Sequence, residues 1–289
     1  MFRHLRIATA LLLCLLAACQ RQPQGGETRP AQAVQALADR LRDNDLTGFA
    51  AMAVPPALHA QLEAGWRDGR SRWPLDELPL DERLPGLLAV LSAKDAETKL
   101  QATFDREFAR AGRDLQAAAA ALGLFGMQYV RNEGDYSAEE RAHYLQSIDA
   151  LSRWASAAPL SDPQRARRTI ALLTAAARRS GIDDDADFAA LGMADSLDRL
   201  QPVFAAFKRT FAGYGLDLDA SFASVDARLL QQTGDSARVR LHYRLGPGEI
   251  DSVVSMQRID GRWYLRDYLR HAEASLVPAA AASAISAAP

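Results

Sequence analysis

The sequence predicts an α+β protein in which a long helical region precedes a small antiparallel sheet. From residue 31 to 214, apolar residues recur at helical spacing between clear helix start and stop signals. From residue 215 to 275, the apolar spacing changes to two and turn residues separate short segments. We therefore expect a helical region over 31–214, followed by an antiparallel β-meander of three or four strands over 215–275.

Residues 1–18 have the three parts of a secretory signal peptide. A short basic segment precedes the apolar run 7–16, and the small residues Ala17 and Ala18 stand directly before Cys19. The segment from residue 7 to Ala18 has 12 residues, whereas a helix needs roughly 20 to cross a membrane. We therefore expect cleavage between Ala18 and Cys19 rather than a transmembrane helix.

The end of this signal, Leu-Ala-Ala-Cys at 16–19, resembles the lipobox of bacterial lipoproteins. The resemblance implies that the Cys19 thiol carries a diacylglyceryl group, with a further chain such as palmitate on the new amino terminus. Two acyl chains suffice for stable anchoring. Gln20, rather than Asp, follows the cysteine, and the resemblance then implies the outer membrane, with the protein facing the periplasm. The alternative is an ordinary secretory signal with an incidental cysteine.

Composition limits what the mature chain does. Loss of Arg3 and Arg6 with the signal leaves 32 basic and 36 acidic residues, a net charge of −4. A nucleic-acid-binding protein is usually basic, so no nucleic-acid partner is expected. Cys14 leaves with the signal and Cys19 is acylated. No thiol then remains for a disulfide or for thiol catalysis.

Two segments outside the predicted domains have little to bury. Residues 20–30 are polar and contain two adjacent glycines, so residues 19–30 are expected to form a lipidated, flexible tether. The 11 residues after Cys19 reach at most about 36–40 Å. Residues 276–289 are an Ala-rich tail of low complexity, expected to be disordered.

The helical region should begin with three short helices and a long loop. Apolar spacing predicts a helix over 31–43, and helices over 46–52 and 56–66 follow a capping aspartate and a Pro-Pro pair. Residues 68–85 contain Pro-Leu-Asp-Glu twice and are punctuated by glycine and proline. We interpret this stretch as a connector, with a partner-docking loop as the alternative.

The next two helices are expected over 95–111 and 113–131. Within the second, residues 117–130 are almost entirely apolar. A helix that is apolar all round normally lies at the centre of a bundle. These residues are too few to span a membrane. We therefore expect this helix to be buried.

Three further helices have terminal signals. The segment Ser137–Glu140 fits a capping box and opens a helix to about residue 157. Asp162 is placed to start the next helix, which Gly181 ends. The last helix is expected over 188–214, broken or kinked before Pro202.

The meander is expected to contain strands over 225–232, 236–245, 249–259 and 262–270. Alternation of apolar and polar side chains predicts each strand, and Asp260-Gly261 is a strong signal for a tight turn.

Two segments are similar to parts of the ketosteroid-isomerase-like cone fold. Residues 31–52 resemble its opening helices, and 260–267 (Asp-Gly-Arg-Trp-Tyr-Leu-Arg-Asp) resembles its final hairpin. The resemblance implies a small-ligand-binding or enzymatic pocket, in which an inward acid such as Asp267 works as a base. The helices between about 70 and 210 would then be an insertion.

Motifs for catalysis, cofactors and metals are missing from the sequence. It has no Gly-x-Ser-x-Gly, Ser-x-x-Lys or P-loop pattern. Glu140 and His143 have the spacing of di-iron ligands, but that motif is needed twice. Residues 183–187 lack the Gly and Glu of a calcium loop, so we interpret them as a helix cap. The pair His59 and Glu63 is interpreted as a surface contact. No catalytic residue, cofactor or metal is expected.

One surface feature suggests binding. Basic residues alternate along the strand 236–245, and guanidinium groups match carboxylates and phosphates. The expected partners are an acidic envelope protein, peptidoglycan or lipid head groups. The alternative is a solvated face paired with acidic residues. The basic stripe comprises Arg238, Arg240, His242 and Arg244, with a proposed extension to Arg266 and Arg270.

Together these features predict a lipid-anchored, periplasm-facing envelope protein that acts by binding or scaffolding. A pocket protein of the cone fold is the first alternative. An assembly partner of a larger envelope complex is the second. It requires an exposed apolar patch beyond the few hundred Å² usual for a monomer.

Overall fold

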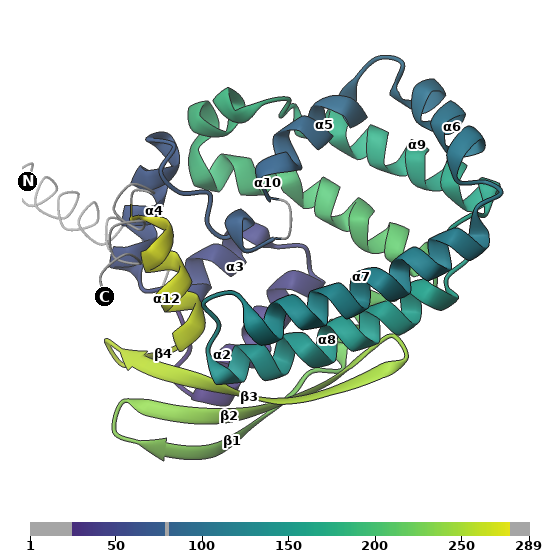
Figure 1. The fold of residues 1–289 in the computed structure, drawn as a ribbon. Helices are drawn as coiled ribbons and strands as arrows, with labels where there is room; N and C mark the ends of the chain where they lie inside the picture. The colour runs from purple at the N-terminus through teal and green to yellow at the C-terminus, as the bar shows by residue number, and fades with distance from the viewer. Residues whose placement is uncertain (1–24, 79–80, 278–289) are drawn as a thin grey trace, which may run out of the picture.

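The computed structural model describes residues 25–78 and 81–277. The predicted signal, its cleavage site at Ala18 and Cys19, and the tail residues 278–289 lie outside these ranges. A mostly helical body is followed by a four-stranded antiparallel sheet (Figure 1), which confirms the predicted α+β class. In the described part of the chain, no helix is both long enough and apolar enough to span a bilayer.

The helices begin and end close to the expected positions. The side chains of Asp45, Ser137 and Asp162 accept hydrogen bonds from first-turn N–H groups, and Gly181 ends its helix with φ 60°. The first helices are α2 (Pro30–Arg42), α3 (Leu46–Ala53), α4 (Pro56–Arg67), α5 (Leu84–Ser92), α6 (Ala96–Glu107) and α7 (Gly112–Asn132). The later helices are α8 (Ala138–Ala157), α9 (Pro163–Ser180), α10 (Asp185–Gly213), α11 (Leu218–Ala223) and α12 (Arg266–Ser275). Short 3-10 helices lie at Leu75–Glu77 and Asp81–Arg83.

The sheet is a meander with neighbouring strands paired in chain order. Asp260 and Gly261 form the last turn with φ 49° and 77°, as the sequence predicts. Helix α2 covers one half of the inner face and α8 the other (Figure 1). The strands are β1 (Asp226–Thr233), β2 (Ser236–Leu245), β3 (Gly248–Ile259) and β4 (Arg262–Leu265).

The largest core joins the helical body to the end of the sheet. Trp66 and Phe188 pack edge to face, with ring centroids 6.0 Å apart. The Trp66 indole N–H donates to the Trp73 carbonyl at 2.7 Å. Tyr264 and Leu269 belong to the same buried cluster. The predicted helical and sheet regions therefore share one core.

The expected strand over 262–270 is wrong beyond Leu265. Strand β4 ends there, and residues 266–275 form α12. Alternation would require an apolar residue at Asp267, which breaks the two-residue pattern. From Leu265 onward, apolar residues recur at Leu269 and Ala272, which is helical spacing, and both are buried.

The break expected before Pro202 occurs elsewhere. Helix α10 keeps helical dihedrals at Pro202, and the kink lies at Gly192, with φ 75° and ψ −179°. Only glycine adopts this conformation readily. The local glycine therefore determines the bend.

Helix α7 is not the centre of a bundle, contrary to expectation. It packs on α8 along one face, where Gly123 lies against Ser152 and Gly126 lies near Ile148. Its other side is open to solvent, and Leu122 is 69% exposed. The α7–α8 hairpin lies at the edge of the molecule (Figure 1). An all-round apolar pattern cannot specify which neighbours are present, so it overestimated burial here.

The last part of the predicted tether is not free of the body. The Gly26 N–H donates to the Met52 carbonyl at 3.0 Å, and the Trp263 N–H donates to Glu27 at 2.8 Å. Glu27 thereby forms a bridge beside β4. Only residues 20–24 then separate Cys19 from the described body, a reach of roughly 18 Å.

Candidate functional site

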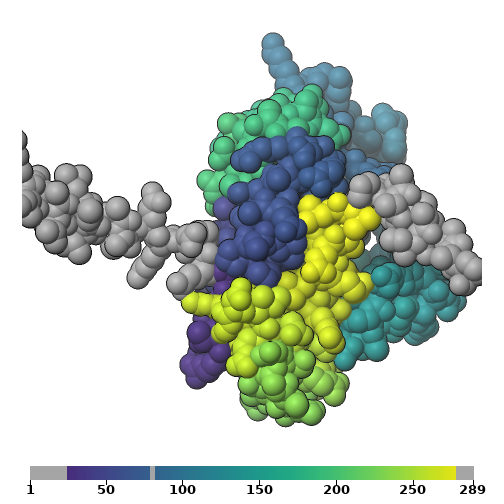
Figure 2. Space-filling view, turned by 90° about the vertical axis from the view of Figure 1, so that its left-hand side faces the viewer, coloured from purple at the N-terminus to yellow at the C-terminus, as the bar shows by residue number. Residues whose placement is uncertain are grey.

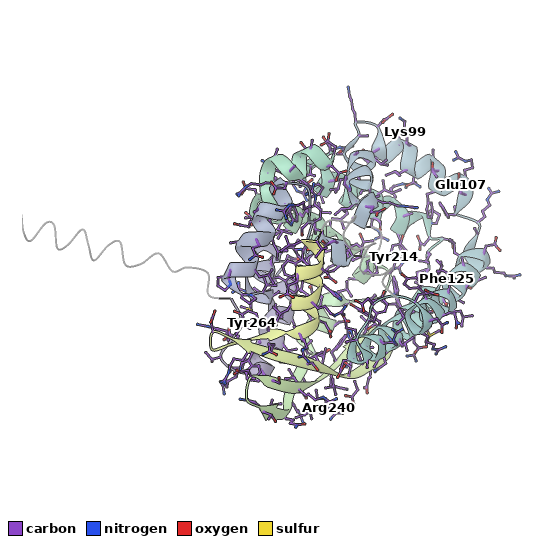
Figure 3. All side chains as sticks on the ribbon, turned by 60° about the vertical axis from the view of Figure 1, so that its left-hand side comes forward. Lys99, Glu107, Phe125, Tyr214, Arg240 and Tyr264 are labelled. Carbon is purple, nitrogen blue, oxygen red and sulfur yellow. The ribbon has the colours of Figure 1, made fainter. Side chains whose placement is uncertain are left out.

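The four basic residues of the predicted stripe lie together on the outer face of β2. Arg238, Arg240 and Arg244 are exposed and His242 is half-buried, while Val239 between them is fully buried. Figure 3 shows Arg240 at the outer surface of the sheet. Period-two alternation therefore predicted the placement of these side chains correctly.

Acidic neighbours neutralise most of this basic stripe. Arg240 donates two hydrogen bonds to Asp251, one of them at 2.8 Å, and this contact raises the pKa of Arg240 and lowers that of Asp251. His242 lies 3.8 Å from Glu249, and Arg238 lies 3.9 Å from Glu139.

A shallow hollow of about 280 Å³ opens on the outer sheet face. It is lined by Asp226, Arg228, Arg240 and His242, and Arg228 pairs with Asp226 at 2.7 Å. Arg240 also already holds an aspartate. The hollow therefore offers little uncompensated positive charge to an anion.

The proposed extension of the stripe is wrong. Arg266 and Arg270 lie on α12 and not on a neighbouring strand. Arg270 contacts Glu140, and it donates to the Asp135 carbonyl at 2.7 Å. Arg270 therefore belongs to a different group of charged residues.

That group is an ionic cluster joining the loop after α4, the start of α8, and α12. His271 bridges two carboxylates, with Nδ1 2.7 Å from Glu77 and Nε2 3.1 Å from Glu140. Arg270 contacts the second oxygen of Glu140. The Glu140 side chain is only 8% exposed, so its charge depends on these partners. We call the set the α8–α12 ionic cluster; it comprises Glu77, Asp135, Glu140, Asp267, Arg270 and His271.

Mutual contact sets the ionisation of this cluster. Hydrogen bonds to Glu140 and Glu77 raise the pKa of His271 to about 10. Burial alone would raise the pKa of Glu140, but hydrogen bonds from His271 and the Ser137 N–H, together with nearby positive charge, lower it. The imidazolium and this carboxylate therefore stabilise each other's charged forms.

Asp267, the candidate base of the cone-fold alternative, belongs to the same cluster. Burial, and secondarily the charge of Glu140, raise its pKa. It accepts a hydrogen bond from the Ser137 hydroxyl at 3.1 Å and lies 3.6 Å from Arg270. Asp267 lines neither of the two hollows described for this chain.

The sequence did not reveal the α8–α12 ionic cluster. The sequence places Glu77 in a connector or docking loop and Asp267 on a strand. It indicates Glu140 as a capping residue and as half of an incomplete di-iron pair with His143. The Ser137–Glu140 capping box does form, with the Ser137 N–H donating to Glu140 at 2.9 Å. The capping pattern in the sequence therefore indicates that Glu140 caps α8, but it does not indicate the contacts of Glu140 with Arg270 and His271.

The possible metal ligands are separated by other interactions. Nε2 of His143 lies 2.8 Å from the Tyr243 hydroxyl, while Glu140 is engaged by α12. Asp184 accepts from the Asp187 N–H at 3.0 Å and forms a capping box, as expected for a helix start. Within residues 25–78 and 81–277, no group of three or more His, Cys, Asp or Glu side chains is arranged to hold a metal ion.

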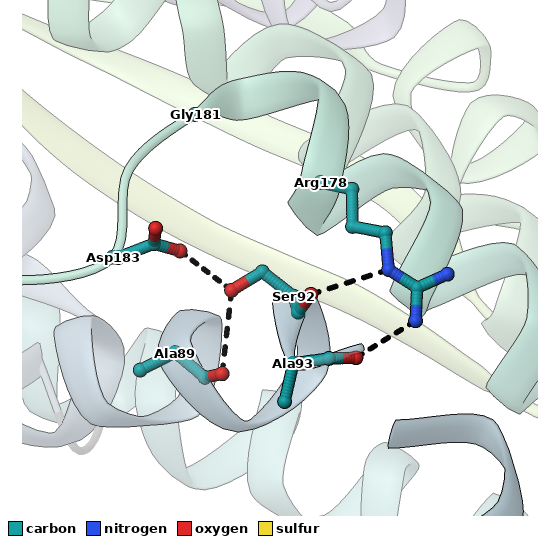
Figure 4. Close-up of a pocket in the computed structure, with 6 residues that line it drawn as sticks. All are labelled: Ala89, Ser92, Ala93, Arg178, Gly181 and Asp183. Carbon is teal, nitrogen blue, oxygen red and sulfur yellow. Dashed lines mark hydrogen bonds between the residues drawn. The ribbon is translucent and has the colours of Figure 1, made fainter. Parts of the chain in front are cut away.

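A second hollow, of about 390 Å³, lies between α5 and the end of α9 (Figure 4). Arg178 donates to the carbonyls of Ser92 and Ala93 at 3.2 and 2.8 Å, and so satisfies the C-terminus of α5. It also pairs with Glu97, and this contact lowers the pKa of Glu97 to about 2. The Ser92 hydroxyl donates to Asp183 at 2.5 Å. These groups hold α5 to α9, and both charged side chains that line the hollow, Arg178 and Asp183, take part in these contacts.

The remaining candidate is the exposed apolar face of α7. Leu124 and Phe125 are 67% and 68% exposed, and Tyr129 is 45% exposed. Figure 3 shows Phe125 on α7, at the edge of the molecule. We call this face the α7 stripe; it comprises Ala117, Ala118, Ala121, Leu122, Leu124, Phe125, Gln128 and Tyr129.

Comparison with known proteins assigns neither a family nor a function, because no family model, curated protein or solved structure matches the chain.

Proposed function

We propose that the mature chain is a lipid-anchored, periplasm-facing protein of the bacterial outer membrane that acts by binding or scaffolding. The lipobox-like Leu-Ala-Ala-Cys at 16–19 supports the anchor. The observation that carries the binding role is the α7 stripe. Large exposed apolar faces on a folded protein typically mark interaction sites.

The charged groups support binding over catalysis. A catalytic acid or base must reach the reacting atoms of a substrate. His271, Arg240 and Arg178 instead contact carboxylates of the chain itself. These contacts stabilise the fold, whereas the α7 stripe is an exposed, mostly apolar surface.

The short tether supports a fixed orientation of the body on the membrane. With a reach of roughly 18 Å, residues 20–24 keep Gly25 and the nearby β4 close to the lipid. In Figure 2, α2, which follows the tether, and the α7–α8 hairpin lie on opposite sides of the molecule. The α7 stripe therefore lies away from the tether and stays accessible to other proteins.

Metabolic labelling with an alkyne fatty acid in a Gram-negative host tests the anchor. The native chain should be labelled and should sediment with outer membranes, and Cys19→Ala should lose both properties. Cys14→Ala is the matched control, because Cys14 leaves with the signal, and it should retain both. An unlabelled native chain, or a Cys19→Ala chain that keeps its label, would contradict lipidation.

A further inference from the structure

The α7 stripe lacks a partner within the described residues. Helix α7 has 21 residues, a length of about 31 Å. One face packs on α8, and the stripe lies on the other. No charged residue interrupts the sequence from Gln116 to Val130. The stripe is therefore an uncharged, mostly apolar surface in which Gln128 is the polar member.

The two halves of the stripe differ in size. Its N-terminal half carries the small residues Ala117, Ala118 and Ala121. Its C-terminal half carries Leu124, Phe125 and Tyr129, all exposed. Helices pack by placing ridges of large side chains into grooves between smaller ones. An antiparallel copy of the same helix meets this requirement, because each large half then lies on a small half.

The charges at the two ends fit the same arrangement. Exposed Arg113 and Asp114 lie in the first turn of α7, exposed Arg131 lies in its last turn, and exposed Glu133 follows directly. A two-fold axis beside Leu122 and Gly123 brings Asp114 of one copy opposite Arg131 of the other. Two such pairs form in each dimer. A parallel arrangement would instead place like charges together, which is unfavourable.

We propose that the occupant of the α7 stripe is a second copy of this chain, packed through α7 in an antiparallel, two-fold symmetric pair. This interaction goes beyond the proposed function: the contact itself does not need the lipid, whereas its predominance in membranes rests on the proposed anchor. It also explains why an apolar helix lies at the edge of the fold. Each copy would use the same patch, as a closed two-fold dimer requires.

The available area sets the strength of this pair. The stripe is one face of a single helix, which offers less area than the roughly 800 Å² per partner of a standard stable interface. We therefore expect a weak dimer in dilute detergent. Anchoring both copies in one membrane raises their effective concentration, and the dimer should then predominate.

Cross-linking in native membranes tests the arrangement. Ala121 lies near the proposed axis, so Ala121→Cys should be joined to its counterpart by a short bis-maleimide. The exposed Ala223 on α11 provides the control variant Ala223→Cys. We expect the Ala121→Cys dimer to exceed the control at least about fivefold, because its thiols are held close together. Equal yields, or cross-links from Ala121→Cys only to other proteins, would overturn the proposal.

A charge exchange provides a second test that does not depend on cross-linking. Asp114→Arg or Arg131→Asp alone should weaken the dimer by about 5- to 10-fold in sedimentation equilibrium. The double variant should restore the native affinity, because it restores opposite charges across the axis. Native protein that stays monomeric at all accessible concentrations, or a double variant as weak as the singles, would contradict the antiparallel pair. Circular dichroism of each variant checks that α7 remains folded.

Discussion

The α7 stripe and the α8–α12 ionic cluster reverse the usual distribution of polar and apolar groups. The stripe holds Phe125 in solvent, whereas the cluster keeps Glu140 only 8% exposed. The cluster is complete in one chain, since its carboxylates contact Arg270 or His271. The stripe, in contrast, stays exposed in the single chain. The comparison teaches that a buried charge needs its partners within the fold, whereas an exposed apolar face is available to a partner outside it.

The largest effect is expected when the cluster loses its central carboxylate. Glu140→Ala leaves Arg270 and His271 without their shared partner, and breaking such a buried pair costs about 3–5 kcal/mol of unfolding free energy. Urea unfolding of the purified chain measures this loss. Glu139→Ala is the matched control, because Glu139 makes only a long contact with Arg238 at 3.9 Å. Equal stability of the two variants would show that the cluster contributes nothing.

The α8–α12 ionic cluster should also make the unfolding free energy fall as pH rises into the alkaline range. The pKa of His271 is raised from 6.5 to about 10, so its stabilisation is complete below pH 6.5 and disappears as pH rises through about 10. The slope is at most about 1.4 kcal/mol per pH unit. Urea midpoints from pH 6 to 9 should fall for the native chain. His271→Asn should lack most of this decline, and an unchanged slope in that variant would assign the effect to other groups.

Two glycines test how α7 is held on its buried side. A Cβ at Gly123 would lie 2.1 Å from the Ser152 hydroxyl, whereas one at Gly126 meets Ile148 at 3.5 Å. Gly123→Ala should therefore cost about 1–3 kcal/mol through overpacking. Gly126→Ala should be neutral or stabilising by up to about 1 kcal/mol, because alanine favours a helix. Thermal unfolding compares the stability of the two variants. Equal losses of stability would show that Gly123 is not packed more closely on α8 than Gly126 is.

The smallest effect on folding is expected in the stripe itself. Leu124→Ser with Phe125→Ser should change the unfolding free energy of the monomer by about 0.5 kcal/mol or less, since both side chains are exposed. The same variant should lose self-association. Denaturant unfolding at low protein concentration and sedimentation at high concentration measure the two properties. A large loss of monomer stability would mean that the stripe packs within one chain.

Local signals in the sequence predicted local structure well. Ser137, Asp162 and Gly181 define helix ends through bonds to residues only a few positions away. Alternation placed Arg238 to Arg244 on one sheet face for the same reason. These features need no knowledge of distant segments.

Features that depend on distant segments were missed. The contact between Glu77 and His271 joins residues 194 positions apart, and no pattern in either segment indicates it. The sequence predicts a strand in place of α12 because Trp263, Leu265 and Leu269 also fit a two-residue spacing. The exposure of α7 could not be predicted, because apolar composition alone does not show whether the covering surface belongs to the same chain.

Hydroxyl-radical footprinting of the native protein tests most directly whether the α7 stripe is covered. Side-chain oxidation at Leu124, Phe125 and Tyr129 should be at least about threefold lower in native membranes than in dilute detergent, because burial excludes the radical with water. Phe207 on α10, which is 43% exposed, provides the internal reference and should react equally in both. Equal oxidation of the stripe in membranes and in detergent would contradict the account, because the stripe would then remain open where the protein is expected to function.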